Sequence, residues 1–336
     1  MSKNNSATDR TSNTLSHIRP HIFNWKGENF PFNGCIRYFM ECAGREDISD
    51  FWLSAYVTGD AYMFVYSADG NRLSNSCLTE RIVIDYDKNY FDNIFDTYGY
   101  EYKYIDGKQV NENKQMYIEM IMDYIDKGLP VFTYGWWRPI CGYENSGKVL
   151  FMLHWDNTTP VKVNTEDCHF ESLLFIGDKI KDVKFDEIYN KAIAKIPQIY
   201  NMNLPNTYLG HKGLYKWADD VENGTYISTS PSIDEWKEAY ICNLATNCFS
   251  EKFGMEHVAD FPIPKNTNRD FIKAMSGIVA SMKKAYDELE AVGGAFNITL
   301  ENLQNESSRK LIAEKIREIG TIQKQVLDVF VKYKSE

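Results

Sequence analysis

The hydrophobic pattern of this chain changes near residue 185, and the change limits the folds that it can adopt. Up to that point, short apolar runs of strand length alternate with short helical stretches and with turns that contain glycine and asparagine. From residue 271 onward, apolar side chains recur three and four positions apart along Lys- and Glu-rich stretches, which places them on one face of a helix. The sequence therefore predicts an α+β fold, in which an α/β domain is followed by a mostly helical domain.

The expected organisation has three parts. Residues 1–19 form a polar lead-in, rich in Ser, Asn and Thr, that is predicted to be disordered. Residues 20–183 are predicted to form the α/β domain, and residues 184–336 the helical domain. The chain has 336 residues, 43% of them hydrophobic, so it is long enough to bury two cores.

Glycine, proline and the apolar spacing indicate the individual elements. Gly44 closes a helix that begins near Cys35, and Gly128 ends a strongly amphipathic helix. Gly59 separates a helix from an aromatic strand, and residues 145–147 form a turn. The other predicted helices span 50–58, 87–98, 114–127, 185–196, 210–223, 271–292 and 300–333. The predicted strands span 61–66, 80–85, 130–134, 139–143, 149–155 and 161–163.

Composition argues against several classes of protein. Lys and Arg number 37 against 47 Asp and Glu, and the resulting net charge of −10 disfavours a nucleic-acid partner. No apolar run approaches the roughly 20 residues that span a bilayer, and the polar N-terminus lacks the apolar segment of a secretory signal. The seven cysteines show neither CxxC nor zinc-site spacing, which is typical of reduced thiols. We therefore expect a cytoplasmic protein without a membrane partner or a bound metal.

Cys35 is the first candidate for chemistry. The polar, glycine-containing Asn33-Gly34 precedes it, and an apolar-periodic segment follows it up to Gly44. At the start of a helix, the helix dipole and unpaired backbone N–H groups favour a thiolate and stabilise an oxyanion. A cysteine among apolar helical residues also suits the role of a small core residue. The residues support both interpretations.

Several short motifs around and after Cys35 match one family. Gly34-Cys35 opens a helix that Gly44 closes, and Gly59 leads into the aromatic run of residues 60–66. A Gly-x-Pro-Val segment, a Gly-Tyr turn and a strand that ends in Asp follow at residues 128–131, 142–143 and 149–156. Together these motifs resemble the N-terminal domain of the butirosin-biosynthesis acyltransferase family, which is similar to papain-like and bacteriocin-processing cysteine peptidases.

The resemblance implies a papain-like domain with a Cys–His–Asp system. In such sites the His deprotonates the thiol, and a third group orients the His. Cys35 would be the nucleophile, and Asp156 matches the position of the orienting acid. The family's His stands several residues before the Gly-Tyr turn, where this chain has no His. His154 is the candidate replacement base, because it lies two positions before Asp156 on a predicted strand and shares its face.

Trp136, Trp137 and Arg138 occupy the segment in which the family has its His. Two indoles and a guanidinium suit ligand stacking better than proton transfer, so these three are candidate substrate-binding residues. Packing of the indoles in the core is the alternative. Asn29 and Asn33 are candidate oxyanion donors, and Asn33 is also a candidate helix cap.

Two functions from different classes remain open. The first is a thiol-dependent acyl enzyme, an amide hydrolase or acyltransferase in peptide or specialised-metabolite biosynthesis, which needs no cofactor. Its partners would be a small-molecule or peptide-like substrate and, for acyl transfer, an acyl-carrier protein. The second is a catalytically inactive papain-like fold that acts as a small-molecule- or peptide-binding accessory protein. Selective alkylation of Cys35 below the ordinary thiol pKa distinguishes the two.

Overall fold

The computed structural model describes residues 10–18, 30–67, 78–79, 87–135, 137–154, 159–225 and 269–333. The predicted strand at 80–85 lies outside these residues.

Contacts within the chain divide it into two units. The first consists of Met1–Ser54 and Tyr98–Val183, and the second of Ala55–Thr97 and Lys184–Glu336. The division after Val183 falls where the sequence places the start of its helical domain. Ala55–Thr97 differs from the expectation, because it belongs with the C-terminal part of the chain although it lies inside the expected α/β domain.

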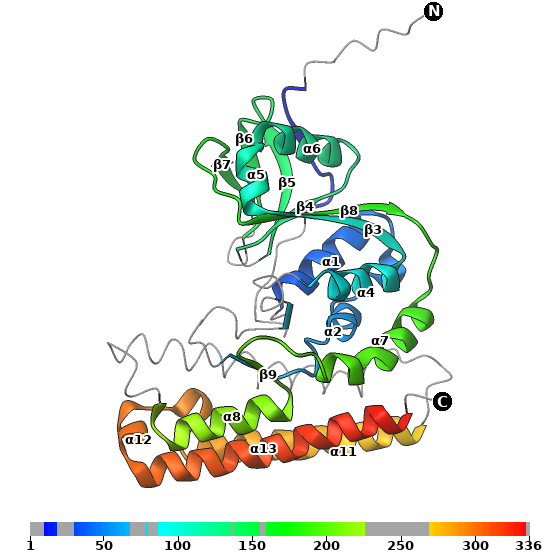
Figure 1. The fold of residues 1–336 in the computed structure, drawn as a ribbon. Helices are drawn as coiled ribbons and strands as arrows, with labels where there is room; N and C mark the ends of the chain where they lie inside the picture. The colour runs from blue at the N-terminus through cyan, green and yellow to red at the C-terminus, as the bar shows by residue number, and fades with distance from the viewer. Residues whose placement is uncertain are drawn as a thin grey trace, which may run out of the picture. The chain divides into compact units, whose positions relative to one another are not determined.

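Within the described residues of the first unit, seven strands form one antiparallel sheet (Figure 1). The strand order is β3-β8-β4-β5-β6-β7, and β1 pairs with β5. Five consecutive residues are buried in each of β5 and β8, as in strands that are covered on both faces. The strands are β1 (Asn13–Thr14), β3 (Tyr100–Asp106), β4 (Val131–Thr133), β5 (Arg138–Glu144), β6 (Val149–Met152), β7 (Val161–Asn164) and β8 (Ser172–Lys179).

Helices pack against this sheet. α6 contacts β1, β4 and β5, and α5 contacts β3 and β8. The end of α6 is the one that the sequence predicts: Gly128 has φ 84°, and the backbone N–H groups of Gly128 and Leu129 donate to the last turn in a Schellman motif. The helices are α1 (Pro31–Cys42), α5 (Gly107–Glu112) and α6 (Lys114–Asp126), and α2 (Phe51–Thr58) begins in the first unit and ends in the second.

Residues 10–18 differ from the disordered lead-in that the sequence predicts. Asn13 and Thr14 form β1 and pair with β5. Arg10 forms an ion pair with Asp123 of α6. Strands pair through backbone N–H and C=O groups, and every residue except proline carries both. A polar composition therefore does not prevent a segment from forming a strand.

The described part of the second unit is mostly helical. α8, α11 and α13 run side by side around one buried apolar cluster (Figure 1). Ile312, Ile316 and Ile319, which the sequence places on one helix face, are buried in it. The elements that lie wholly or mainly in this unit are β2 (Val65–Ser67), α4 (Lys88–Tyr98), α7 (Phe185–Tyr200), β9 (Thr207–Leu209), α8 (His211–Glu222), α11 (Arg269–Ala291), α12 (Leu300–Gln304) and α13 (Glu306–Tyr333), with β2 and β9 paired antiparallel.

Two helix boundaries differ from the prediction. α7 continues through Pro197 to Tyr200, although a proline has no N–H for the preceding turn. The Tyr200 hydroxyl donates to the carbonyl of Tyr62, so a tertiary contact holds this last turn. The predicted helix at 300–333 is split at Asn305, whose side-chain oxygen accepts from a backbone N–H in the first turn of α13.

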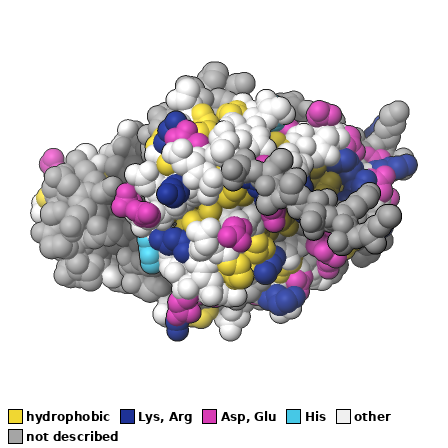
Figure 2. Space-filling model, turned by 90° about the horizontal axis from the view of Figure 1, so that it is seen from above, with side chains coloured by type: hydrophobic (Ala, Val, Ile, Leu, Met, Phe, Trp, Pro, Cys, Tyr) yellow, Lys and Arg dark blue, Asp and Glu magenta, His cyan; other side chains and the backbone are white. Residues whose placement is uncertain are grey.

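The α+β class and the largely helical C-terminal region are therefore confirmed. Among the described helices, none combines the length and the apolar character needed to cross a bilayer. On the face shown in Figure 2, the described basic side chains lie among acidic ones.

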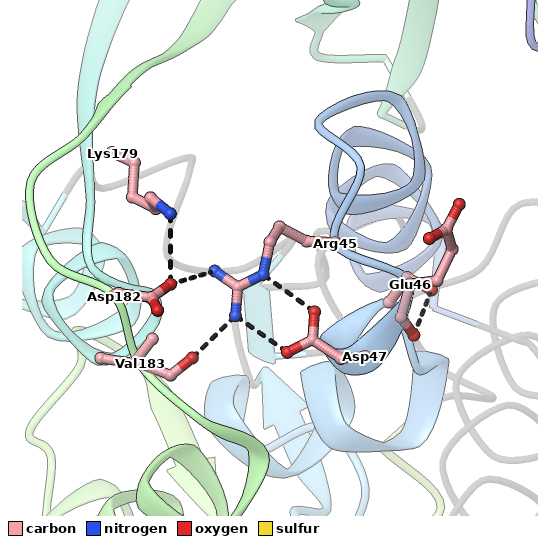
Figure 3. Close-up of polar contacts among 7 residues, drawn as sticks. Arg45, Glu46, Asp47, Lys179, Asp182 and Val183 are labelled. Carbon is pink, nitrogen blue, oxygen red and sulfur yellow. Dashed lines mark hydrogen bonds and ion pairs between the residues drawn. The ribbon is translucent and has the colours of Figure 1, made fainter.

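Arg45 connects two loops of the first unit (Figure 3). Its guanidinium forms a bidentate ion pair with Asp47, in which Nε donates to Oδ1 at 2.8 Å and Nη2 donates to Oδ2 at 3.0 Å. It also donates to the carbonyl of Val183 at 2.7 Å and lies 3.3 Å from Asp182, which in turn pairs with Lys179. One cation thus ties the segment after α1 to the residues at which the chain leaves this unit.

Candidate functional site

Cys35 lies in the second turn of α1. Pro31 occupies the first position, where its missing N–H costs no hydrogen bond. The backbone N–H of Gly34 already donates to the carbonyl of Phe30, so the unpaired amides of this helix end before Cys35. The Cys35 side chain is 0% exposed, and its thiol donates to the carbonyl of Trp137 at 3.1 Å. This contact uses the thiol proton, which a thiolate does not have.

Trp137 is a core residue in the structure. Its side chain is buried, and its ring packs edge-to-face on Phe32 and Tyr134, with centroid distances of 4.8 and 5.7 Å. The backbone of Trp137 has φ 43°, in the left-handed region that bulky residues rarely adopt. Of the two readings that the sequence leaves open for Trp137, the structure favours core packing. Trp136 lies outside the described residues.

Arg138 and His154 lie together. Arg138 begins β5, and His154 follows its antiparallel neighbour β6. Nη1 of Arg138 is 3.0 Å from Nε2 of His154. A guanidinium only donates, so Nε2 is assigned as the acceptor and a neutral ring carries its proton on Nδ1. Asp156 lies outside the described residues, and the system of Cys35, His154 and Asp156 stays a prediction.

A hollow of about 640 Å³ lies beside α5 in the first unit. Glu171 lines it, and Gly135 lies near both Glu171 and Arg138: a Cβ atom on Gly135 would lie 2.9 Å from Nη2 of Arg138 and 3.7 Å from Oε1 of Glu171. Arg138 and His154 thus form a polar pair, the Arg138 group, and Glu171 of the hollow lies near the same glycine as Arg138. The other lining residues are Gly107, Lys108, Asn111, Glu112, His169 and Phe170.

Asn33 is buried inside the first unit and not at the helix start. Its side-chain oxygen accepts from the hydroxyl of Ser54 at 2.9 Å, which links α1 to α2. The N-cap of α1 is Phe30, and no side-chain hydrogen bond caps the helix. The prediction that Asn33 caps the helix is therefore wrong, and its role as an oxyanion donor stays a prediction. Asn29 lies outside the described residues.

Sequence reasoning missed three residues around the Arg138 group: Glu171, Lys114 and Cys168. The Lys114 ammonium donates to the carbonyls of Cys168, at 2.7 Å, and Thr165, at 3.2 Å. Burial raises the pKa of the Cys168 thiol, and the charges of Lys114 and Arg138 act in the opposite direction. No motif spacing relates Lys114 to Cys168, because the two lie 54 positions apart and meet only in the folded chain.

Two other described thiols are poor nucleophiles. Burial raises the pKa of Cys42 and of Cys141 to about 12, so both stay protonated at neutral pH. In the described part of the chain, no cluster of three or more His, Cys, Asp or Glu side chains is placed to hold a metal ion.

Comparison with models of known protein families finds no match for this chain, and comparison with curated proteins finds no significant match either.

Proposed function

We propose that the first unit is a papain-like fold that binds a peptide-like or small biosynthetic molecule as an accessory protein, without thiol catalysis. The observation that carries the proposal is the state of Cys35. Its side chain is fully buried and its proton is used in a bond to the Trp137 carbonyl. A nucleophilic thiol needs access to its substrate and a thiolate form, and this placement favours neither.

The Arg138 group supports the binding part of the proposal. A guanidinium has five N–H donors, and Nε of Arg138 is buried without a hydrogen-bond partner among the described residues. Glu171, which lines the hollow beside α5, lies near the same glycine as Arg138. An unused guanidinium donor suits a ligand with a carboxylate or an amide carbonyl, as peptides and many biosynthetic intermediates have.

Alkylation of the native protein tests the proposal. The full chain is treated with iodoacetamide between pH 6 and 9, with and without urea, and the modified cysteines are located by mass spectrometry. We expect Cys35 to stay unmodified in the native protein over the pH range in which it reacts in urea. Cys168→Ala is the control, because removing a half-buried thiol should leave the protection of Cys35 unchanged. Selective modification of Cys35 below pH 8 in the native protein overturns the proposal.

One observation favours the thiol-dependent acyl enzyme as a second candidate. Trp137 and Arg138 are consecutive, so one dipeptide contacts both the Cys35 thiol and the His154 ring. If a local opening freed the thiol, both groups would be close to the same turn. Stoichiometric acetylation of Cys35 by p-nitrophenyl acetate, lost in His154→Gln, is the result that supports this candidate.

A further inference from the structure

A small pocket lies between α4 and α7 in the second unit. Its volume is about 130 Å³. An apolar cavity of about 150 Å³ accommodates benzene, so the pocket fits a ligand body of about that size. Apolar side chains make up half of its lining, and they come from α2, α4, α7 and the residue pair that follows α7: Val57, Tyr90, Ile94, Ile199 and Met202.

Lys195 carries the one positive charge among the described lining residues. Its ammonium donates to the carbonyl of Asn93 and to the hydroxyl of Thr97, each at 3.0 Å. The Thr97 hydroxyl in turn donates to the same carbonyl at 2.6 Å. Both acceptors of Lys195 are neutral, and within the described ranges no carboxylate forms an ion pair with it. An ammonium has three N–H donors, so one remains for a ligand.

The other charges around the pocket do not neutralise Lys195. Asp87 lines the pocket, but its Oδ1 accepts from the backbone N–H groups of Asn89 and Tyr90 and so caps α4. Burial lowers the pKa of Lys195, and the charge of Lys191 lowers it further, while Asp96 opposes them. An anion bound beside Lys195 would therefore stabilise the charged form of its ammonium.

We propose that this pocket binds a small organic monocarboxylate, whose apolar body fills the space between α4 and α7 and whose carboxylate pairs with the Lys195 ammonium. Amide groups of Asn89, Asn93 and Gln198 also line the pocket and supply polar contacts at the carboxylate end. A single cation and a lining that is half apolar suit one carboxylate better than a phosphate dianion, which needs several donors. This site lies in the second unit and does not depend on the function proposed for the first.

The test compares four small probes by ligand-observed NMR on the full chain: pentanoate, benzoate, 1-pentanol and inorganic phosphate. We expect pentanoate and benzoate to bind at least about tenfold more tightly than pentanol, which has the apolar body without the charge. Phosphate should bind at least about tenfold more weakly than either carboxylate. Equal binding of pentanol, equal binding of phosphate, or no binding of either carboxylate overturns the proposal.

Two variants locate the site. Lys195→Met keeps an apolar stem of similar length and should weaken pentanoate binding at least about tenfold. Lys191→Met removes a charge one turn earlier on α7, outside the pocket lining, and should weaken binding by less than about threefold. If Lys195→Met does not fold, Met202→Trp enlarges a side chain of the pocket lining while Lys195 stays in place, and it should abolish binding. Unchanged binding in whichever of these two pocket variants folds overturns the proposal.

Discussion

Among single residues, the buried and half-buried polar groups of this protein are held by contacts that neighbouring residues in the sequence do not reveal. Asp60 is buried, and its carboxylate accepts from the hydroxyls of Thr58 and Thr79 and from the backbone N–H of Leu78. A buried carboxylate is tolerated only when such donors bind it, because removing it from water is costly. Each buried donor or acceptor left without a hydrogen-bond partner costs about 1–3 kcal/mol. Thr79 and Leu78 lie almost twenty positions away, so the sequence offers no signal for this arrangement.

The ion pair of Arg45 and Asp47 makes stability depend on pH. The Arg45 guanidinium lowers the pKa of the Asp47 carboxyl below its ordinary value. The folded state therefore holds the charged carboxylate more strongly than the unfolded chain does, and the stabilisation is present above the unfolded pKa and is lost as pH falls through the folded one. We expect Asp47→Asn to lower the free energy of unfolding by about 0.5–1 kcal/mol at pH 7, a modest value because Asp47 is largely exposed.

Urea denaturation of the wild type and Asp47→Asn at pH 7 and pH 3 checks this expectation. The difference between the two proteins should shrink toward pH 3, where the wild-type carboxyl also takes up a proton. A difference that is constant over this range would show that the pair does not contribute through its charge.

Among individual elements, two turns illustrate when glycine is required. Gly128, after α6, has φ 84°, and a Cβ atom added there would meet nothing within 4 Å. Gly147, in the hairpin between β5 and β6, has φ 83°, but its added Cβ would lie 2.6 Å from Ile118 and 2.8 Å from Met122 of α6. The two positions share a positive φ and differ in the space around it.

Alanine substitution at these two glycines should therefore have unequal costs. Gly128→Ala should destabilise the protein by about 1 kcal/mol, the strain of a left-handed alanine. Gly147→Ala should cost about 2–4 kcal/mol, because the strain is joined by overpacking against α6. Thermal or urea denaturation of both variants measures the difference. Equal costs would mean that the hairpin moves away from α6 freely.

At the scale of the whole molecule, the three helices α8, α11 and α13 hold nearly half of the described α-helical residues and share one apolar cluster. Ile316 on α13 is 0% exposed in that cluster, whereas Leu311 on the same helix is 43% exposed. Ile316→Ala should lower the free energy of unfolding of the second unit by about 3 kcal/mol, through lost burial and a residual cavity. Leu311→Ala should stay within about 0.5 kcal/mol of the wild type.

The pair is measured by urea denaturation followed by circular dichroism at a helical wavelength. Both variants replace a branched aliphatic side chain of α13 by alanine. Alanine has a slightly higher helix propensity than either residue, so propensity does not explain a difference in stability between the two variants. A loss in Leu311→Ala as large as that in Ile316→Ala would place the stabilising contacts elsewhere.

Local signals predicted much of this fold. The apolar spacing located α6, α8, α11 and the face of α13 that carries Ile316, and Gly128 located the end of α6. Such features depend on residues within one or two helical turns, so they are present in the sequence itself. β3 and β8 were missed. The first five residues of β8 are all buried and show no alternation, whereas exposure alternates along most of β3.

The candidate site could be predicted only as a set of residues. The sequence identified Cys35 and the segment of Trp137 and Arg138, but nothing in it shows that the Cys35 thiol is buried against a carbonyl 102 residues away. Two other features depend in the same way on contacts between distant segments. Ala55–Thr97 belongs to the second unit, and Lys195 contacts Asn93. Periodicity and turn chemistry come from adjacent residues, whereas burial and contacts between distant segments exist only after the chain has packed.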